Sequence, residues 1–163
     1  MSGRETRNLT FLGEPVVYTR AQDTGYGKLA TYSWDGTIID ALRPDLEKKL
    51  DFRFDYVLVH IYETGEDHIS PHFDSGALNS SIASVSFGAA RKFRLRKMEE
   101  TKGWEKEFRL VSGDVIVMWG PGKCGDALGC QRIYKHYVPK ESKALNASSL
   151  FSLTLLATTN PSV

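Results

Sequence analysis

The sequence predicts a mainly β domain with a sandwich-like or barrel-like core. From residue 52 onward the chain carries short runs rich in Val, Ile, Leu, Phe and Tyr, which favour strands. These runs are FRFDYVLVHIY, IASVSFG, RKFRLRK, KEFRLVSGDVIVMW and SLFSLTLLAT. Gly, Asp, Asn and Ser separate them, as expected of turns. Short strands at close spacing favour an all-β core over alternating βαβ units.

One helix is expected before this β region. In residues 37–50, Leu42, Leu46 and Leu50 lie four apart, and lysines stand near the end of the segment. This spacing places the leucines on one face of a helix, and lysines suit a helix C-terminus. The first 35 residues are rich in Gly, Tyr and Thr and show no helical period, so they predict loops and hairpins.

Length and composition indicate a single globular domain spanning residues 1–163. Of the 163 residues, 41% are hydrophobic and 25% are charged, and the net charge is +1. This composition excludes fibrous and disordered classes and provides no overall field that would attract nucleic acid or an anionic membrane. We expect no membrane partner. The sequence does not specify the oligomeric state, and a monomer is the expectation.

Cysteine content and the N-terminal sequence predict an intracellular protein, located in the cytoplasm or the nucleus. Two cysteines, Cys124 and Cys130, are too few for a disulfide framework or for two ligand pairs of a zinc site. The N-terminus has no apolar core of signal-peptide length, and no apolar run reaches the ~20 residues that span a bilayer.

A possible metal motif follows the first long strand of the β region. Residues two apart in a strand project to the same side, so His72 and Asp74 can present an imidazole and a carboxylate to one metal ion. These are two ligands of the facial triad of non-haem iron(II) oxygenases. His136, on a strand-like run downstream, is the candidate third ligand. A His-x-Asp tripeptide alone also fits hydrogen-bonded structural residues. His68 is close to the motif, but its loop position predicts a surface residue rather than a ligand.

Several segments in order resemble the AlkB family of 2-oxoglutarate and iron(II)-dependent dioxygenases. They are EPVVYTR, ATYSWDG, VLVHIYETGEDHISPHFD, IASVSFGAARKFRLRK, LVSGDVIVMWGP, KHYVPK and SLTLLAT. The resemblance implies a double-stranded β-helix, of the jelly-roll or cupin-like kind, over residues 51–158. It also implies that residues 1–50 form a lid and support segment with a short helix and lid-like hairpins.

The resemblance also implies a set of site residues. His72, Asp74 and His136 match the iron ligands, which are also the catalytic residues of the family. The expected cofactors are Fe(II), the co-substrate 2-oxoglutarate and O2. Positions that match the co-substrate pocket are Leu58, His60, Tyr62, Ser86 and Ser152. The family hydroxylates an N-alkyl carbon, and the unstable product then loses an aldehyde.

The chain departs from the family at the anchor for the distal carboxylate of 2-oxoglutarate. Leu150 and Leu156 stand where the family has two arginines in the last strand. A buried carboxylate needs a cation, so we expect a replacement. His60 is one candidate, and the basic candidates are Arg91, Lys92, Arg94, Arg96, Arg132 and Lys135. Each of the six also fits a solvated surface charge.

Two further features bear on the substrate. Ser75, Gly76 and Ala77 follow the motif where relatives that act on bases carry acidic residues. An insertion at 123–134 is either a surface loop or a substrate-facing loop. Aromatic residues near the N-terminus, among them Tyr32 and Trp34, can stack on a base or pack against the sheet.

These patterns predict an Fe(II)/2-oxoglutarate-dependent dioxygenase that demethylates N-alkylated bases of DNA or RNA, taken as single strands or as a flipped base. Two alternatives stay open. One is an AlkB-like oxygenase acting on a protein or a small molecule. The other is a non-catalytic binding module that retains the fold.

Overall fold

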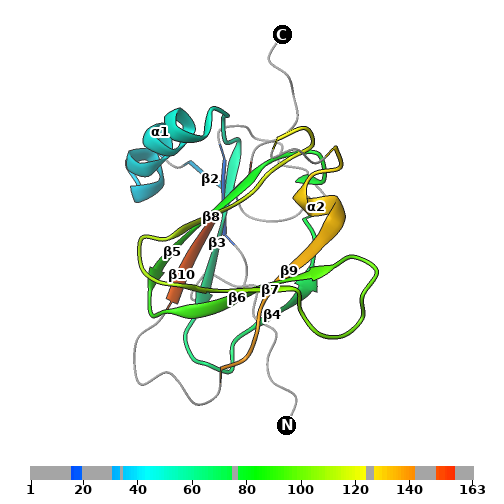
Figure 1. The fold of residues 1–163 in the computed structure, drawn as a ribbon. Helices are drawn as coiled ribbons and strands as arrows, with labels where there is room; N and C mark the ends of the chain where they lie inside the picture. Colours follow the sequence, from blue (N-terminus) through cyan, green and yellow to red (C-terminus); the bar gives the residue numbers. More distant parts are fainter. Residues whose placement is uncertain are drawn as a thin grey trace.

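The computed structural model describes residues 16–19, 31–33, 35–74, 77–123, 127–141 and 150–156. Its elements are β1 (Val16–Thr19), β2 (Thr31–Tyr32), α1 (Ile38–Leu50), β3 (Tyr56–Tyr62), β4 (Ile69–His72), β5 (Ile82–Gly88), β6 (Arg91–Lys97), β7 (Lys106–Leu110), β8 (Val115–Met118), α2 (Cys130–Ile133), β9 (Tyr134–Val138) and β10 (Leu150–Leu156). Figure 1 shows two layers of strands with α1 beside them. The predicted mainly β fold and the helix at 37–50 are confirmed.

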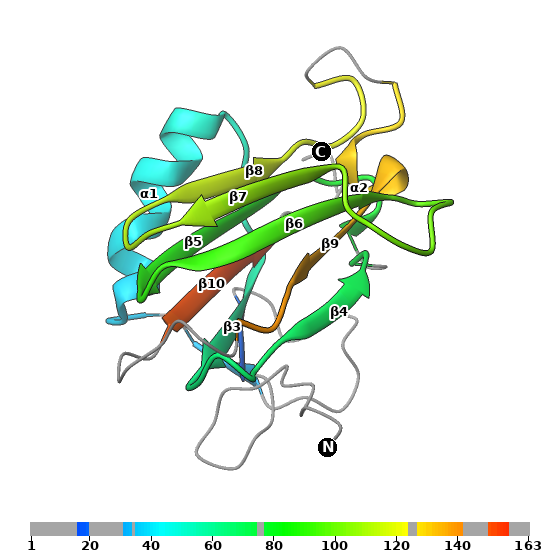
Figure 2. The ribbon, with the colours of Figure 1, turned by 60° about the horizontal axis from the view of Figure 1, so that its bottom comes forward.

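The strands form two sheets, and the strands from β3 to β10 are divided equally between them. The larger sheet has the order β2-β1-β3-β10-β5-β8, and the smaller has the order β4-β9-β6-β7. Along the chain, β3, β5, β8 and β10 join the larger sheet, while β4, β6, β7 and β9 join the smaller one (Figure 2). All pairings within this set are antiparallel. This interleaving is the jelly-roll arrangement of a double-stranded β-helix, as the resemblance implied.

The alternating side chains of the larger sheet divide it into two faces. In β5, Ala83 and Val85 pack in one hydrophobic cluster with residues of α1, whereas Ile82 belongs to a second cluster between the two sheets. The same division holds in β3, where Val57 packs with the α1 cluster and Leu58 with the inner one. One face is therefore sealed by α1, and the other is turned toward the smaller sheet.

The leucines that predicted α1 pack as expected. Leu42, Leu46 and Leu50 contact the cluster that contains the buried Ile39 and Phe54. Arg43 forms an ion pair with Glu47 one turn later, at 2.8 Å between Nη1 and Oε2. Among the described residues, no helix is long and apolar enough to cross a membrane.

The N-terminal strands differ in part from the expected hairpins. β1 pairs antiparallel with β3, but β1 and β2 pair in parallel. Parallel neighbours cannot be joined by a tight turn, so these two strands do not form a hairpin with each other. A second helix, the four-residue α2 immediately before β9, also lay outside the sequence-based expectation.

A buried arginine at the start of β6 holds together the loops that flank β4 and β9. The Arg91 side chain is 2% exposed. Its Nη1 donates to the carbonyl of Thr64 at 2.8 Å, and its Nη2 donates to those of Asp67 at 2.7 Å and Pro139 at 2.9 Å. Its Nε lies 3.2 Å from Oε2 of Glu141. One side chain thus fixes the turn before β4 and the segment after β9.

We expect Arg91→Met to lower the free energy of unfolding by about 3–5 kcal/mol, because it leaves the Glu141 carboxylate without its buried partner. Arg109→Met is the matched control. Arg109 contacts the same carboxylate at 3.2 Å, but its side chain is 52% exposed, so its loss should cost no more than about 1 kcal/mol. Urea unfolding of both variants measures the difference, and equal effects would contradict this structural role of Arg91.

Candidate metal centre

Two histidines face each other across the pair formed by β4 and β9. His72 is the last residue of β4 and lies opposite His136 in the antiparallel register. Their ring centroids are 4.2 Å apart, and the ring of Phe93 stacks on His136 at 5.8 Å. The two imidazoles therefore come from neighbouring strands and meet on the side that faces the larger sheet.

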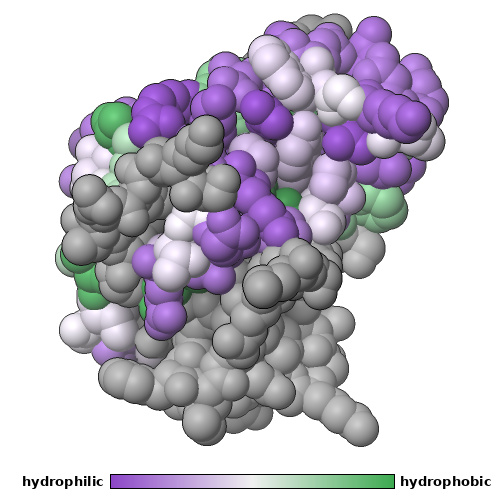
Figure 3. Space-filling view, turned by 90° about the horizontal axis from the view of Figure 1, so that it is seen from below, coloured by the Kyte–Doolittle hydropathy of each residue, from purple (hydrophilic) through white to green (hydrophobic). Residues whose placement is uncertain are grey.

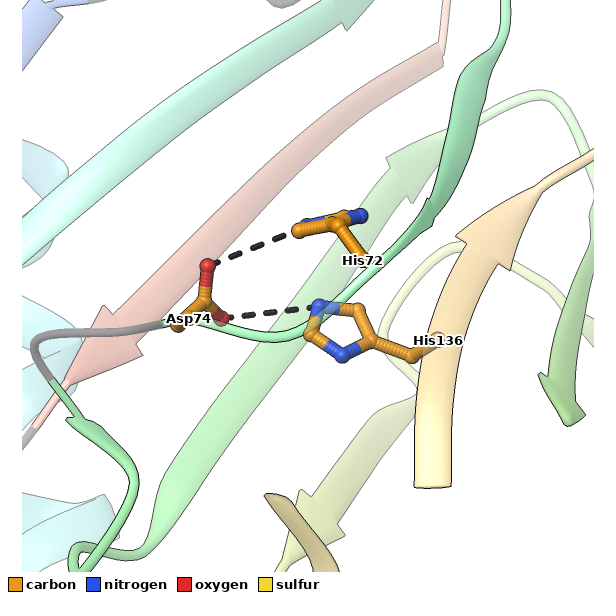
Figure 4. Close-up of side chains that lie close together, drawn as sticks. All are labelled: His72, Asp74 and His136. Atoms are coloured by element: carbon orange, nitrogen blue, oxygen red, sulfur yellow. Dashed lines mark ion pairs between the residues drawn. The ribbon is translucent and has the colours of Figure 1, made fainter. Parts of the chain in front are cut away.

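The carboxylate of Asp74 lies between the two imidazoles (Figure 4). Its Oδ1 is 3.8 Å from Nε2 of His72, and its Oδ2 is 3.5 Å from Nε2 of His136. The predicted group is thus brought together, although not by strand alternation alone. β4 ends at His72, so Asp74 lies just beyond the strand, and β4 also has a register irregularity between Ile69 and His72.

A backbone hydrogen bond orients the ring of His72. Its Nδ1 lies 2.9 Å from the carbonyl oxygen of Ser70, and because a carbonyl only accepts, Nδ1 carries the proton. In the neutral ring, Nε2 then presents a lone pair toward Asp74. This backbone contact is the kind that fixes the tautomer of a metal-binding histidine.

The chemistry and spacing of these three groups fit a metal ion. One donor atom from each of His72, Asp74 and His136 lies within 4.8 Å of the other two. Two imidazoles and one carboxylate form the donor set of non-haem iron(II) sites, which leave coordination positions open. A cation placed among them would also separate the lone pair on Nε2 of His72 from the carboxylate oxygens of Asp74 that face it.

The triad opens onto a cavity between the two sheets. The cavity is lined by His60, Tyr62, Ile69, His72, Asp74, Ser84, Ser86, Arg91, Lys92, Phe93, Leu110, His136 and Val138. The larger sheet contributes polar groups from β3 and β5, and the smaller sheet contributes apolar walls, the two triad histidines, Arg91 and Lys92. A cavity with apolar walls and a few placed polar groups is typical of small-molecule sites.

Most of the residues that the family resemblance assigned to the co-substrate pocket lie at this cavity. His60, Tyr62 and Ser86 line it, whereas Leu58 packs in the inner hydrophobic cluster beside it and is not among the described lining residues. Ser152 lies in β10, where its backbone pairs with His60 on one side and Ser86 on the other.

Of the six basic candidates, Arg91 is the one whose side chain is buried at the cavity. Burial lowers the pKa of its guanidinium, while Glu141, Tyr62 and Asp67 act in the opposite direction. An arginine nevertheless remains charged in a protein. Its guanidinium carbon lies 5.5 Å from the centre of the Tyr62 ring. The cavity therefore contains a buried positive charge next to a tyrosine.

The side chains of Lys92, Arg94 and Arg96 contact groups outside the cavity. The ammonium of Lys92 lies 3.5 Å from Glu107, although the residue also borders the cavity. Arg94 pairs with the same carboxylate at 2.6 Å, which lowers the pKa of Glu107. Arg96 donates to the carbonyl of Gly103 at 2.8 Å.

The last two candidates lie near β9. Arg132 donates to Oδ1 of Asn79 at 3.0 Å, on the surface. Lys135 lies opposite Arg96 in the antiparallel register of β9 and β6, one residue before the inward His136. Neither is among the described residues that line the cavity.

The proposed base-contacting aromatics are not placed at the site. Trp34 lies outside the described residues, as do Ser75 and Gly76. Tyr32 is the last residue of β2, where only its backbone is described. The insertion at 123–134 is described in part, and its final residues form α2, which leads directly into β9.

Three residues near the triad were not predicted. Ser84 lines the cavity one alternation before Ser86, so strand period alone could have identified it. Phe93 follows from the same rule on β6. Gln131 is 1% exposed and its Oε1 accepts a hydrogen bond from the backbone N–H of Asp74 at 3.0 Å. No sequence signal marks that contact.

Comparison with known proteins agrees with this geometry. A family model described as the 2OG-Fe(II) oxygenase superfamily matches residues 19–158. The uncharacterized protein R406 of Acanthamoeba polyphaga mimivirus is 30% identical over 119 residues, which are 71% of this chain and 56% of that protein. The chain therefore spans little more than half the length of this relative.

Two further relatives are named DNA oxidative demethylase ALKBH2. The Bos taurus protein is 45% identical over 60 residues, 35% of this chain and 21% of that protein. The Homo sapiens protein is 32% identical over 94 residues, 52% of this chain and 36% of that protein. The solved structure of OsALKBH1 is 22% identical, with a TM-score of 0.47 over 72% of this chain and 59% of that one.

The family match covers β2 to β10 and all three metal-binding candidates, and Fe(II), 2-oxoglutarate and O2 are the cofactor and co-substrates that it implies. The chain belongs to the 2OG-Fe(II) oxygenase superfamily, and part of it is similar in sequence to the two proteins named ALKBH2.

Proposed function

We propose that this protein is an Fe(II)- and 2-oxoglutarate-dependent dioxygenase that oxidatively demethylates N-alkylated bases in DNA or RNA. The observation that carries the proposal is the convergence of His72, Asp74 and His136 at one end of a cavity between the two sheets. The family match and the two relatives named as DNA oxidative demethylases support it.

In this proposal His72, Asp74 and His136 hold the metal, which supplies oxidation chemistry together with dioxygen and 2-oxoglutarate when bound. Three protein ligands leave positions open for these partners. Ser70 keeps the His72 ring in the tautomer that presents Nε2. Ile69 and Val138 line the cavity with apolar side chains, and an apolar lining strengthens electrostatic interactions beside it.

The same proposal assigns the distal carboxylate of 2-oxoglutarate to Arg91. Position 150, where the family has an arginine, pairs with Tyr62 in β3 and with Gly88 in β5. Arg91 begins the strand that follows Gly88, and its guanidinium lies over Tyr62. Arg91 therefore places a cation beside Tyr62, the residue that pairs with position 150, where the family has an arginine.

Arg91 retains some capacity for a further acceptor. A guanidinium has five N–H donors, and its hydrogen bonds to three carbonyls use three of them within the described part of the chain. Nε lies 3.2 Å from Glu141 but makes no hydrogen bond in this geometry, and these contacts leave the second N–H of Nη1 unused. A carboxylate near it would gain a charge-assisted hydrogen bond in a buried environment.

The substrate class remains part of the proposal. A mostly hydrophilic surface surrounds small, separate hydrophobic patches among the described residues in Figure 3, which suits a polar substrate such as a nucleic acid. A protein or small-molecule substrate is the second candidate, favoured by the net charge of +1 and by Ser75 and Gly76 after the motif. A non-catalytic module is the third, favoured by Leu150 and Leu156.

Succinate formation tests whether the protein is an enzyme. With iron(II), ascorbate and 2-oxoglutarate, we expect the wild type to form succinate and His72→Ala to remain at background, because the variant loses a metal ligand. Arg132→Ala, which changes a surface contact with Asn79, should match the wild type. Background succinate from the folded wild type would favour the non-catalytic module.

The choice of substrate is tested separately, in the same assay. A methylated single-stranded oligonucleotide should stimulate succinate formation and release formaldehyde, whereas a methylated peptide of equal concentration should do neither. The unmethylated oligonucleotide is the control. Stimulation by the peptide alone would replace nucleic acid with protein as the substrate class, while turnover that neither stimulates would leave the enzyme assignment intact and exclude both probes as substrates.

The role of Arg91 predicts selectivity for a dicarboxylate. We expect the wild type to prefer 2-oxoglutarate over 2-oxopentanoate, which lacks the distal carboxylate, by about 10- to 100-fold in kcat/KM, as a hydrogen bond between charged groups contributes roughly 1.5–3 kcal/mol. Arg91→Lys should retain part of this preference and Arg91→Met should abolish it. Arg94→Met, which changes a residue of the same strand that contacts Glu107 outside the cavity, is the control and should keep the preference.

Two results would contradict the role of Arg91. One is a wild type that uses both 2-oxo acids equally, a measurement that requires no variant to fold. The other is an Arg91→Met protein that folds, as judged by circular dichroism, and keeps the full preference.

A further inference from the structure

The backbone of the carboxylate ligand is held by a contact from outside its own sheet. β4 ends at His72, so the N–H of Asp74 has no partner in the strand ladder. Instead it donates to Oε1 of Gln131 at 3.0 Å, and the carbonyl of Asp74 accepts from the N–H of Ala77 at 2.9 Å. The two histidines are fixed by strand pairing, but the aspartate depends on these contacts.

The side chain of Gln131 is fixed in turn by its surroundings. It is 1% exposed, and its Nε2 donates to the sulfur of Met118 at 3.5 Å. Both ends of the amide are therefore engaged inside the protein. A buried amide in this state holds its partner in one position, because releasing either bond would leave a buried polar group unsatisfied.

The helix that carries Gln131 is docked firmly despite its short length. The N–H of Cys130 donates to the carbonyl of Trp119 at 2.8 Å. Gly129 has φ 77°, and a Cβ there would lie 2.7 Å from the backbone nitrogen of Pro121, so only glycine allows this close approach. The end of the 123–134 insertion is thus packed against the end of β8.

We propose that Gln131 is a positioning residue for the metal centre, which sets the carboxylate of Asp74 between His72 and His136. It lies five residues before His136 and one turn of α2 before β9. The segment that delivers the third ligand therefore also holds the second. The inference rests on the proposed metal site and adds a role for the insertion, which the sequence had left as a surface or substrate-facing loop.

The test is the affinity of the purified protein for cobalt(II), which uses the same nitrogen and oxygen donors as iron(II). Gln131→Met keeps the length of the side chain but removes the acceptor, and we expect its dissociation constant to rise about 10- to 100-fold, as is typical when an outer contact of a metal ligand is lost. Calorimetry measures the constant, and the visible spectrum of the bound cobalt should also change.

Two variants separate positioning from packing. Gln131→Glu keeps an acceptor oxygen, and because a carboxyl group buried there takes up a proton rather than remain charged, this variant should stay within about threefold of the wild type. Arg132→Met alters the next residue of α2, whose side chain reaches Asn79 on the surface, and should leave cobalt affinity unchanged. Equal losses in Gln131→Met and Gln131→Glu, or no loss in Gln131→Met, would overturn the role of Gln131.

A measurement on the wild type applies even if Gln131→Met does not fold. Hydrogen exchange at the Asp74 amide should be slowed at least about tenfold relative to an open amide, although the residue lies outside a strand. Free exchange there would overturn the role of Gln131 alone. A folded wild type that binds no cobalt would overturn the metal site itself, and with it both the proposed function and this role.

Discussion

The ion pair between Arg91 and Glu141 is the interaction on which the arrangement of the site depends. A guanidinium that is 2% exposed has lost nearly all its hydration, and such a charge is tolerated only when hydrogen bonds and an opposite charge replace the water. The replacements come from Thr64, Asp67 and Pro139, which lie in different segments. The need to satisfy one charge therefore brings these segments together.

The contacts of Arg91 matter because the pairing between β4 and β9, which carry the two histidine ligands, is short and irregular. β4 has four residues and β9 has five, and their register shifts between Ile69 and His72. Few ladder hydrogen bonds hold such a pair. Arg91 fixes the chain before β4 and after β9, while Gln131 fixes it at Asp74. The triad is thus supported at both ends by side chains that are themselves buried and hydrogen-bonded.

Strand periodicity explains how much of the site could be predicted from the sequence. The short β-rich runs predicted an all-β core, and the period of two explains why His60 and Tyr62, two apart in β3, both line the cavity. The same period in RKFRLRK also separates Arg91, Phe93 and Leu95, which are buried, from Lys92 and Arg94, which are only partly buried. The sequence therefore held the signal that selects Arg91 among the basic candidates.

Other features had no local signal. Asp74 reaches the histidines from a position past the end of β4, so its placement depends on the loop and on Gln131 rather than on alternation. Gln131 stands 57 residues from Asp74 along the chain. A polar residue in a short insertion reads as surface in any sequence pattern, and only the docking of α2 against the end of β8 buries it.

The charges around Glu141 bear on what the cavity can accept. Arg91 and Arg109 both lie 3.2 Å from this carboxylate, one buried and the other half exposed. Two guanidinium groups share one carboxylate, so this cluster carries a net positive charge. Solvent screens Arg109 but reaches Arg91 poorly. The excess charge is therefore felt most strongly on the cavity side, beside Tyr62, where an anion would find both a cation and a low-dielectric environment.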